Sequence, residues 1–357
     1  TDALWSATEN GAELRFFTTD GNAIQTERFR LDSNSRISLS NNDGNSYNTV
    51  FGYHALSNAG TVLGNVGADY NVAVGHLAMG TGTTTDATNN VGIGWSALAA
   101  ITDGDDNVVI GYAAGDEMTG NAGNIVIGKN AMGVADAGES YNVAIGHQSM
   151  SAMDNAATDG NVAIGSSSFV GGTGTNIGNI AIGDNALDST GDEDHTGTIA
   201  IGQQALTALT TGAKNTAIGY QAGKAIVGGI NNTILGYNAA LLLTAGGNNT
   251  VLGYAALDAA DGTEEHNIAI GTGAMGAVDE GSHADAVANE NIAIGSAALS
   301  GGTFSGSDLD LLGNVVVGYN AMSSTSTNAQ TGTVAIGHSA LTALTSGARN
   351  TAVGYQC

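Results

Sequence analysis

Acidic residues crowd into several segments between apolar stretches, and their oxygens are the first groups in this chain that suggest chemistry. TDGDDN (102–107) carries Asp103, Asp105 and Asp106, and GDEDHTG (191–197) carries Asp192 and Asp194. Ca²⁺ is a hard cation that binds several oxygen ligands, so both segments are candidate calcium sites. A solvated acidic surface is the alternative, because the distal Glu of a complete calcium-binding loop is not in place. Apart from calcium, the sequence suggests no cofactor.

Aromatic and histidine side chains fill a second recurrent position, directly after a glycine. Its occupants include His76, His147, His338, Trp95, Tyr112, Tyr220, Tyr237, Tyr254, Tyr319 and Tyr355. A stripe of exposed rings is a surface on which sugars stack, and packing of each ring against its neighbour is the alternative. In a trimer, three symmetry-related His would form a metal site on the axis. The alternative is that each His is a polar residue that points outward and binds no metal.

Familiar catalytic arrangements do not stand out. The sequence shows neither a Ser-His-Asp nor a Cys-His arrangement, and it contains no G-x-x-x-x-G-K phosphate-binding loop. Spacing alone does not exclude a pair of carboxylates that hydrolyses a glycoside. No repeat differs from its neighbours in a way that indicates a dedicated catalytic unit. We therefore expect that the chain is not an enzyme.

The elements that carry these side chains are copies of one short phrase: Asn, apolar, small, apolar, Gly. It occurs 17 times, 17 to 24 residues apart, which is typical of a solenoid. Representative members are Asn142, Ile145 and Gly146, Asn215, Ile218 and Gly219, and Asn350 and Gly354. Residues 203–221 also match residues 338–356, which indicates duplication of a block of repeats.

The five positions of the phrase, numbered from the Asn, predict a short β-strand. Side chains alternate between the two faces of a strand, so positions 2 and 4 share one face and positions 3 and 5 share the other. We expect the bulky face of positions 2 and 4 to line the interior. The Ala and Gly face is nearly bare, and we expect it to press against another backbone, as in a trimer.

Other columns of the repeat have structural roles. Position 1 is Asn in 15 of 17 copies and predicts a ladder of stacked amides, while the Gly at position 5 allows a bend. Position 8 is small, and position 9 is rich in Leu and Met, which we expect to fill the core. Cys357 occupies position 8, either as a small buried residue or as a link between chains.

Composition limits the partners. The net charge is −25, from 33 acidic and 8 basic residues, so the surface repels nucleic acid and anionic membranes. No apolar run reaches the length of a membrane span, and one Cys provides no disulfide framework within the chain. The chain begins at Thr1 and stops within a repeat at Cys357, so we expect a fragment of a longer fibre.

The phrase N-V-A-I-G-x-x-(A/S), at 142–149 and 161–168, resembles the head repeat of trimeric autotransporter adhesins. The stretch 30–57, which leads into tandem N-T-x-x-G-Y-x-A repeats, is similar to bacteriophage tail fibres. The resemblance covers residues 30–357. It implies a β-solenoid of three chains, located in a virion tail fibre or on a cell surface.

The sequence thus predicts an all-β chain, with a non-repetitive β segment at 1–47 and a parallel β-solenoid of 17 repeats at 48–357. We expect the structural shaft of a phage tail fibre that positions a receptor-binding tip, as a homotrimer beside other fibre or virion proteins. The alternative is the head of a trimeric adhesin that binds host matrix or a host-surface glycan. An ice-binding surface would need Thr at the same position of nearly every repeat. Thr occupies position 2 in only five copies, which disfavours ice binding.

Overall fold

The computed structural model describes residues 14–19, 25–31, 37–38, 47–56, 68–136, 138–278, 287–301, 310–324, 330–345 and 347–357. Towards the N-terminus, β1 (Leu14–Thr19), β2 (Gln25–Leu31) and β3 (Ile37–Ser38) form an antiparallel sheet in the order β1-β2-β3. All three strands lie within residues 1–47, where the sequence predicts a non-repetitive β segment.

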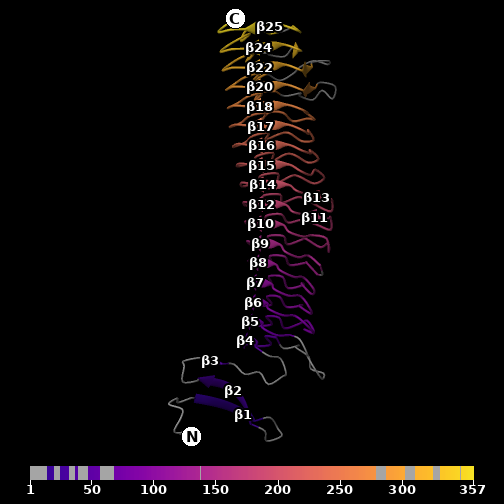
Figure 1. The fold of residues 1–357 in the computed structure, drawn as a ribbon, viewed down its shortest axis with the longest axis vertical. Coiled ribbons are helices and arrows are strands. Elements are labelled where there is room, and N and C mark those ends of the chain that lie inside the picture. The colour runs from indigo at the N-terminus through magenta and orange to yellow at the C-terminus, as the bar shows by residue number, and fades with distance from the viewer. Residues whose placement is uncertain are drawn as a thin grey trace.

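One parallel sheet contains 17 strands of three residues each, stacked in chain order along the molecule (Figure 1). Each strand pairs in register with the same positions of the next repeat, so that Ala144 lies beside Ala163. The predicted all-β parallel β-solenoid is therefore confirmed. The strands are β4 (Thr49–Phe51), β5 (Val72–Val74), β6 (Val91–Ile93), β7 (Val108–Ile110), β8 (Ile125–Ile127), β9 (Val143–Ile145), β10 (Val162–Ile164), β12 (Ile180–Ile182), β14 (Ile199–Ile201), β15 (Thr216–Ile218), β16 (Thr233–Leu235), β17 (Thr250–Leu252), β18 (Ile268–Ile270), β20 (Ile292–Ile294), β22 (Val315–Val317), β24 (Val334–Ile336) and β25 (Thr351–Val353).

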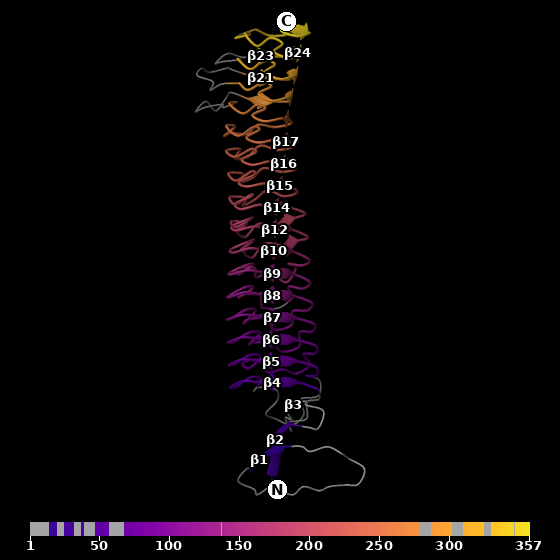
Figure 2. The ribbon, with the colours of Figure 1, turned by 90° about the vertical axis from the view of Figure 1, so that its left-hand side faces the viewer.

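Two smaller parallel sheets lie within the connecting segments. One pairs β11 (Asn176–Ile177) with β13 (His195–Thr196). The other joins β19 (Ala288–Asn289), β21 (Leu311–Leu312) and β23 (Gln330–Thr331). The main strands form a column along one side of the solenoid, and the connecting segments project from the opposite side (Figures 1 and 2).

The face of the strands that points inward is the reverse of the sequence prediction. In β9 the middle residue, Ala144, is fully buried, whereas Val143 and Ile145 are partly exposed. The same pattern recurs from β5 to β24, where position 3 is buried and positions 2 and 4 reach solvent. The prediction that positions 2 and 4 line the interior was wrong, and so was the assignment of the Ala face to a contact between chains.

The reason lies across the coil, at position 9. Most of its large side chains are fully buried, among them Met79, Met150 and Phe169, which confirms that these residues fill the core, whereas Leu341 is only partly buried. The buried side chains at position 9 occupy volume opposite the strand, so that position 3 is Ala in ten of the 17 copies. The larger Ile234 lies beside Gly223, which occupies position 9 of the preceding coil. At Gly92, which occupies position 3, an added Cβ would already lie 3.0 Å from Cγ of Met79.

The predicted ladder of Asn side chains is also confirmed. Asn161 donates from Nδ2 to Oδ1 of Asn142 at 3.1 Å and to the carbonyl of Asn176 at 2.7 Å. Its own Oδ1 accepts from the backbone N–H of Asn179 at 2.9 Å. The amide therefore satisfies a buried backbone carbonyl of its own coil and a buried backbone N–H of the next coil. Either group would cost about 1–3 kcal/mol of stability if it were left without a partner.

Backbone dihedrals show a feature that sequence reasoning missed. Non-glycine residues with positive φ recur at positions 7 and 9 of the coil, such as Gln148 at 56° and Met150 at 52°. This left-handed conformation is unfavourable for large side chains. At position 9 it directs Leu or Met into the core, and burial of that side chain offsets the cost of the backbone.

Candidate functional site

Stacked aromatic rings form an exposed column at position 6, directly after the conserved bend in each coil. Tyr220, Tyr237 and Tyr254 have ring centroids 4.9 and 5.6 Å apart, with interplanar angles of 18° and 11°. A second stack contains Tyr53, His76, Trp95 and Tyr112, and a third contains Tyr319, His338 and Tyr355. We call these three stacks the aromatic column. The rings therefore pack on one another, which confirms that alternative, while stacking of a sugar on them stays a prediction.

An apolar face lies beside the aromatic column. We call it the outer strand face, and it consists of the side chains at positions 2 and 4 of the 17 strands. Apart from Thr, these side chains are apolar, and none of them carries a charge. Leu235 and Leu252 in neighbouring coils are 43% and 41% exposed. A continuous exposed stripe of this kind is typical of a surface that another molecule covers.

The predicted calcium residues connect successive coils. Oδ1 of Asp105 accepts hydrogen bonds from the backbone N–H of Thr88 at 2.6 Å and from its hydroxyl at 2.8 Å. Asp192 makes the same pair of contacts with Thr173, and the backbone bond lowers the pKa of this exposed carboxyl.

The remaining calcium candidates make fewer contacts of this kind. Asp194 accepts from the N–H of Thr175 at 2.7 Å, and Asp103 accepts from the hydroxyl of Thr102 at 2.8 Å. Asp106 contributes its backbone N–H, which donates to the carbonyl of Thr88 at 3.0 Å. None of the five joins a cluster of three metal-ligating side chains among the described residues. Calcium binding at these positions stays a prediction.

A different acidic cluster appears in the structure, formed by Asp136, Glu139 and Asp154. One carboxylate oxygen from each lies within 4.8 Å of the others. Asp136 and Asp154 are exposed, whereas Glu139 is fully buried. Sequence reasoning missed this cluster because its members belong to two coils, although each Asp stands twelve residues after a ladder Asn, Asn124 or Asn142.

Glu139 belongs to a column of buried polar side chains, each located three residues before position 1 of the next coil. We call it the inner polar column, and in five successive coils it contains Asn121, Glu139, Thr158, Asn176 and His195, all fully buried. Asn121 donates to Glu139 at 2.6 Å. The ring nitrogens of His195 lie 2.8 Å from the carbonyl oxygen of Gly212 and 3.1 Å from that of Thr190.

Burial raises the pKa of Glu139, and the negative charge of Asp136 adds to this rise. A carboxyl with a higher pKa in the folded state binds its proton more tightly there than in the unfolded chain. Its contribution to stability is therefore complete below the unfolded pKa and is lost as pH rises through the folded pKa.

We expect the urea midpoint of the protein in EDTA to fall between pH 4 and pH 8 by more in the wild type than in Glu139→Gln. The comparison between the two proteins is necessary because burial also raises the pKa of Asp116, Asp188 and Asp258. Identical pH profiles for the two proteins would contradict the prediction.

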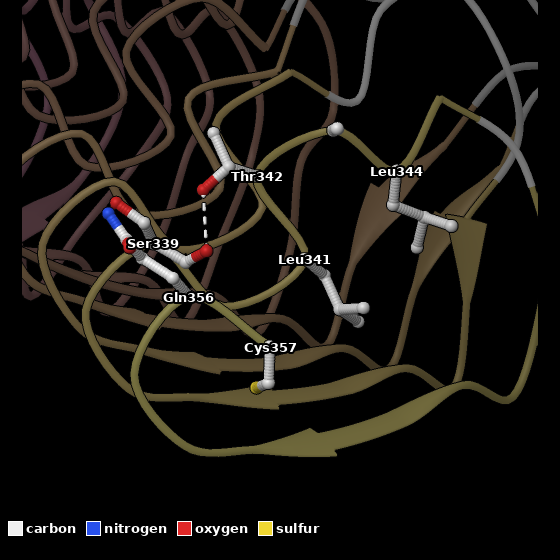
Figure 3. A pocket seen from close by; sticks show the side chains of 7 residues that line it. Ser339, Leu341, Thr342, Leu344, Gln356 and Cys357 are labelled. Atoms are coloured by element: carbon white, nitrogen blue, oxygen red, sulfur yellow. Dashed lines mark hydrogen bonds between the residues drawn. The ribbon is translucent and has the colours of Figure 1, made fainter.

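The C-terminal end of the solenoid has a shallow hollow lined by Ser339, Leu341, Thr342, Gln356 and Cys357, among others (Figure 3). Thr342 donates from its hydroxyl to the carbonyl of Ser339 at 2.7 Å. Cys357 is exposed, and its Sγ lies 3.3 Å from the carbonyl oxygen of Gly354. Of the two predicted roles of Cys357, burial as a small residue is not observed in this structure, and a link between chains stays a prediction.

Comparison of the chain with family models, with curated proteins and with solved structures finds no match. Within the described part of the chain, no helix has the length and apolar character to cross a membrane. Three surfaces of the solenoid are therefore candidates for a function: the outer strand face, the aromatic column and the acidic cluster.

Proposed function

We propose that the chain is the structural shaft of a phage tail fibre or a related virion appendage, which holds a receptor-binding tip away from the particle. The shaft is a homotrimer, and the outer strand face of each chain packs against its neighbours. Other fibre or virion proteins continue the fibre, and the protein is not an enzyme.

The observation that carries this proposal is the outer strand face, which is apolar, uncharged and runs over all 17 strands. Burial of apolar surface stabilises association by roughly 25 cal/mol per Å², so a stripe of this length favours association between chains. The net charge of −25 keeps the remaining surface soluble. The resemblance to tail fibres and trimeric adhesin heads supports three as the number of chains.

The native mass of the chain, measured by light scattering, tests the trimer. We expect three times the chain mass of 35.3 kDa. A monomer at micromolar concentration would contradict the trimeric shaft and leave the outer strand face free for another ligand.

A second candidate function is the head of a surface adhesin that binds a glycan. The aromatic column favours it, because Tyr237 and Tyr254 are 49% and 58% exposed and parallel to each other. Glycan-array binding distinguishes the two functions. A shaft is expected to bind no glycan, whereas an adhesin is expected to bind one and to lose it in Tyr237→Ala.

A further inference from the structure

We propose that Asp136, Glu139 and Asp154 form a binding site for a hard divalent cation, with Ca²⁺ as the best match, which clamps two successive coils of the solenoid. This site is distinct from the acidic segments that the sequence singled out, and it does not depend on the proposed function or on the number of chains.

The geometry of the three carboxylates suits a cation. Asp136 and Asp154 occupy the same position of successive coils, twelve residues after Asn124 and Asn142. Their oxygens and an oxygen of Glu139 lie within 4.8 Å of one another. Ca²⁺ binds oxygens at about 2.3–2.6 Å, so one ion is able to reach all three groups.

Burial of Glu139 is the second observation, and it points to a ligand. Its side chain is fully buried. Oε2 accepts from Nδ2 of Asn121 at 2.6 Å, while Oε1 has no hydrogen-bond partner. A buried carboxylate is unfavourable unless it is neutralised or paired. A proton on Glu139 would neutralise that group alone, whereas a cation would also neutralise the two neighbouring Asp side chains.

The accessibility of the cluster provides a route for the ion. Asp136 and Asp154 are exposed on the side of the connecting segments, and Glu139 lies beneath them in the inner polar column. The three ligands therefore lead from solvent to a buried oxygen. Remaining coordination positions stay open to water.

The same constellation recurs in the sequence, 125 residues further along, as Asp261, Glu264 and Asp279. Both triads have the second acid three residues after the first and the third acid fifteen residues after the second. Glu264 is fully buried in the inner polar column, like Glu139. Asp279 lies outside the described residues.

The two Asp positions are specific to these coils. The position twelve residues after position 1 is Thr in eight of the 16 repeats that extend this far, and Asp in four. Those four are Asp136, Asp154, Asp261 and Asp279, two pairs in successive coils. Glu enters the inner polar column only in the first coil of each pair. Random placement of acids in loops does not explain why the three residues occur together twice.

Calorimetric titration of the full chain tests the proposal, after removal of metal with EDTA and exchange into chelator-free buffer at pH 7. We expect wild type to bind Ca²⁺. We expect Glu139→Gln to bind one Ca²⁺ ion fewer per chain than wild type. The substitution keeps the shape of the side chain and removes its charge. Glu117→Gln is the matched control, because Glu117 is an exposed acid outside the cluster and outside the acidic segments, and we expect it to keep the wild-type stoichiometry.

A thermal melt with and without CaCl₂ separates loss of the site from loss of the fold. We expect Glu139→Gln to melt cooperatively. We also expect CaCl₂ to raise its melting temperature by less than it raises that of wild type. Absence of binding to wild type would overturn the proposal. It would also be overturned by an unchanged stoichiometry in a folded Glu139→Gln protein.

Discussion

Replacement of Gly219 by Ala is expected to break the solenoid in the middle of its sheet. Gly219 has φ of 142°, a conformation that residues with a side chain rarely adopt. An added Cβ would also collide with the carbonyl group of Gly236 in the next coil. That neighbour is unable to retreat freely, because the N–H of Gly236 donates to the carbonyl of Ile218 at 2.9 Å. We expect a loss of roughly 3 kcal/mol or more in the free energy of unfolding.

Gly197→Ala is the matched control for this prediction. Gly197 also has a positive φ, of 65°, but an added Cβ there meets no atom within 4 Å. Its conformation is the left-handed one, which costs a residue with a side chain about 1–2 kcal/mol. Urea unfolding measures the two losses, and hydrogen exchange shows whether protection decreases first in the coils around Gly219. Equal stability of the two variants would contradict the steric role of the Gly column.

The double variant Leu235→Asp and Leu252→Asp is expected to dissociate the proposed trimer. Both Leu belong to the outer strand face, in neighbouring coils, and their side chains are 43% and 41% exposed in the single chain. In a trimer the new carboxylates would be buried against apolar side chains of another chain, without a counter-charge. Burial of such charges is unfavourable by several kcal/mol for each ion. We expect light scattering to show a shift from trimer to monomer at low micromolar concentration.

Val227→Asp and Leu242→Asp together form the control. These side chains are 45% and 46% exposed, so they are as accessible as the two Leu, but they lie in connecting segments and outside the strands. We expect this double variant to keep the native mass. If both double variants dissociate, the added negative charge is the cause wherever it lies on the surface. If neither dissociates, the outer strand face is not the contact between chains.

Regular features of the repeat could be predicted from the sequence because they depend on local chemistry. Only Gly tolerates the bend at Gly146, where φ is 142°, so its column is evident in the pattern. The Asn ladder follows from stacking identical amides at a fixed period, and Asn161 shows the expected bonds to the coils on either side. The Met residues of position 9 were correctly predicted as core, because flexible apolar side chains of this kind fill irregular gaps in a core.

The side of each strand that faces inward could not be predicted. Alternation shows that Val143 and Ile145 share one face and that Ala144 points to the other, but it carries no information about which face is covered. That choice depends on position 9, where Met150 adopts a left-handed φ of 52° and is fully buried. Its volume favours a small residue such as Ala144 on the inner face of the strand.

The acidic cluster depends on the tertiary structure for a similar reason. Glu139 and Asp154 are fifteen residues apart in the chain, and only the winding of the coil brings their oxygens within 4.8 Å. Acids that are adjacent in sequence, such as Asp105 and Asp106, were more conspicuous, yet they do not form such a cluster. The sequence by itself thus determined the period, the ladder, the bend and the core residues of position 9, because each follows from one position repeated. The tertiary structure decided which face is outside and which carboxylates meet, because both depend on how different positions approach one another across the coil.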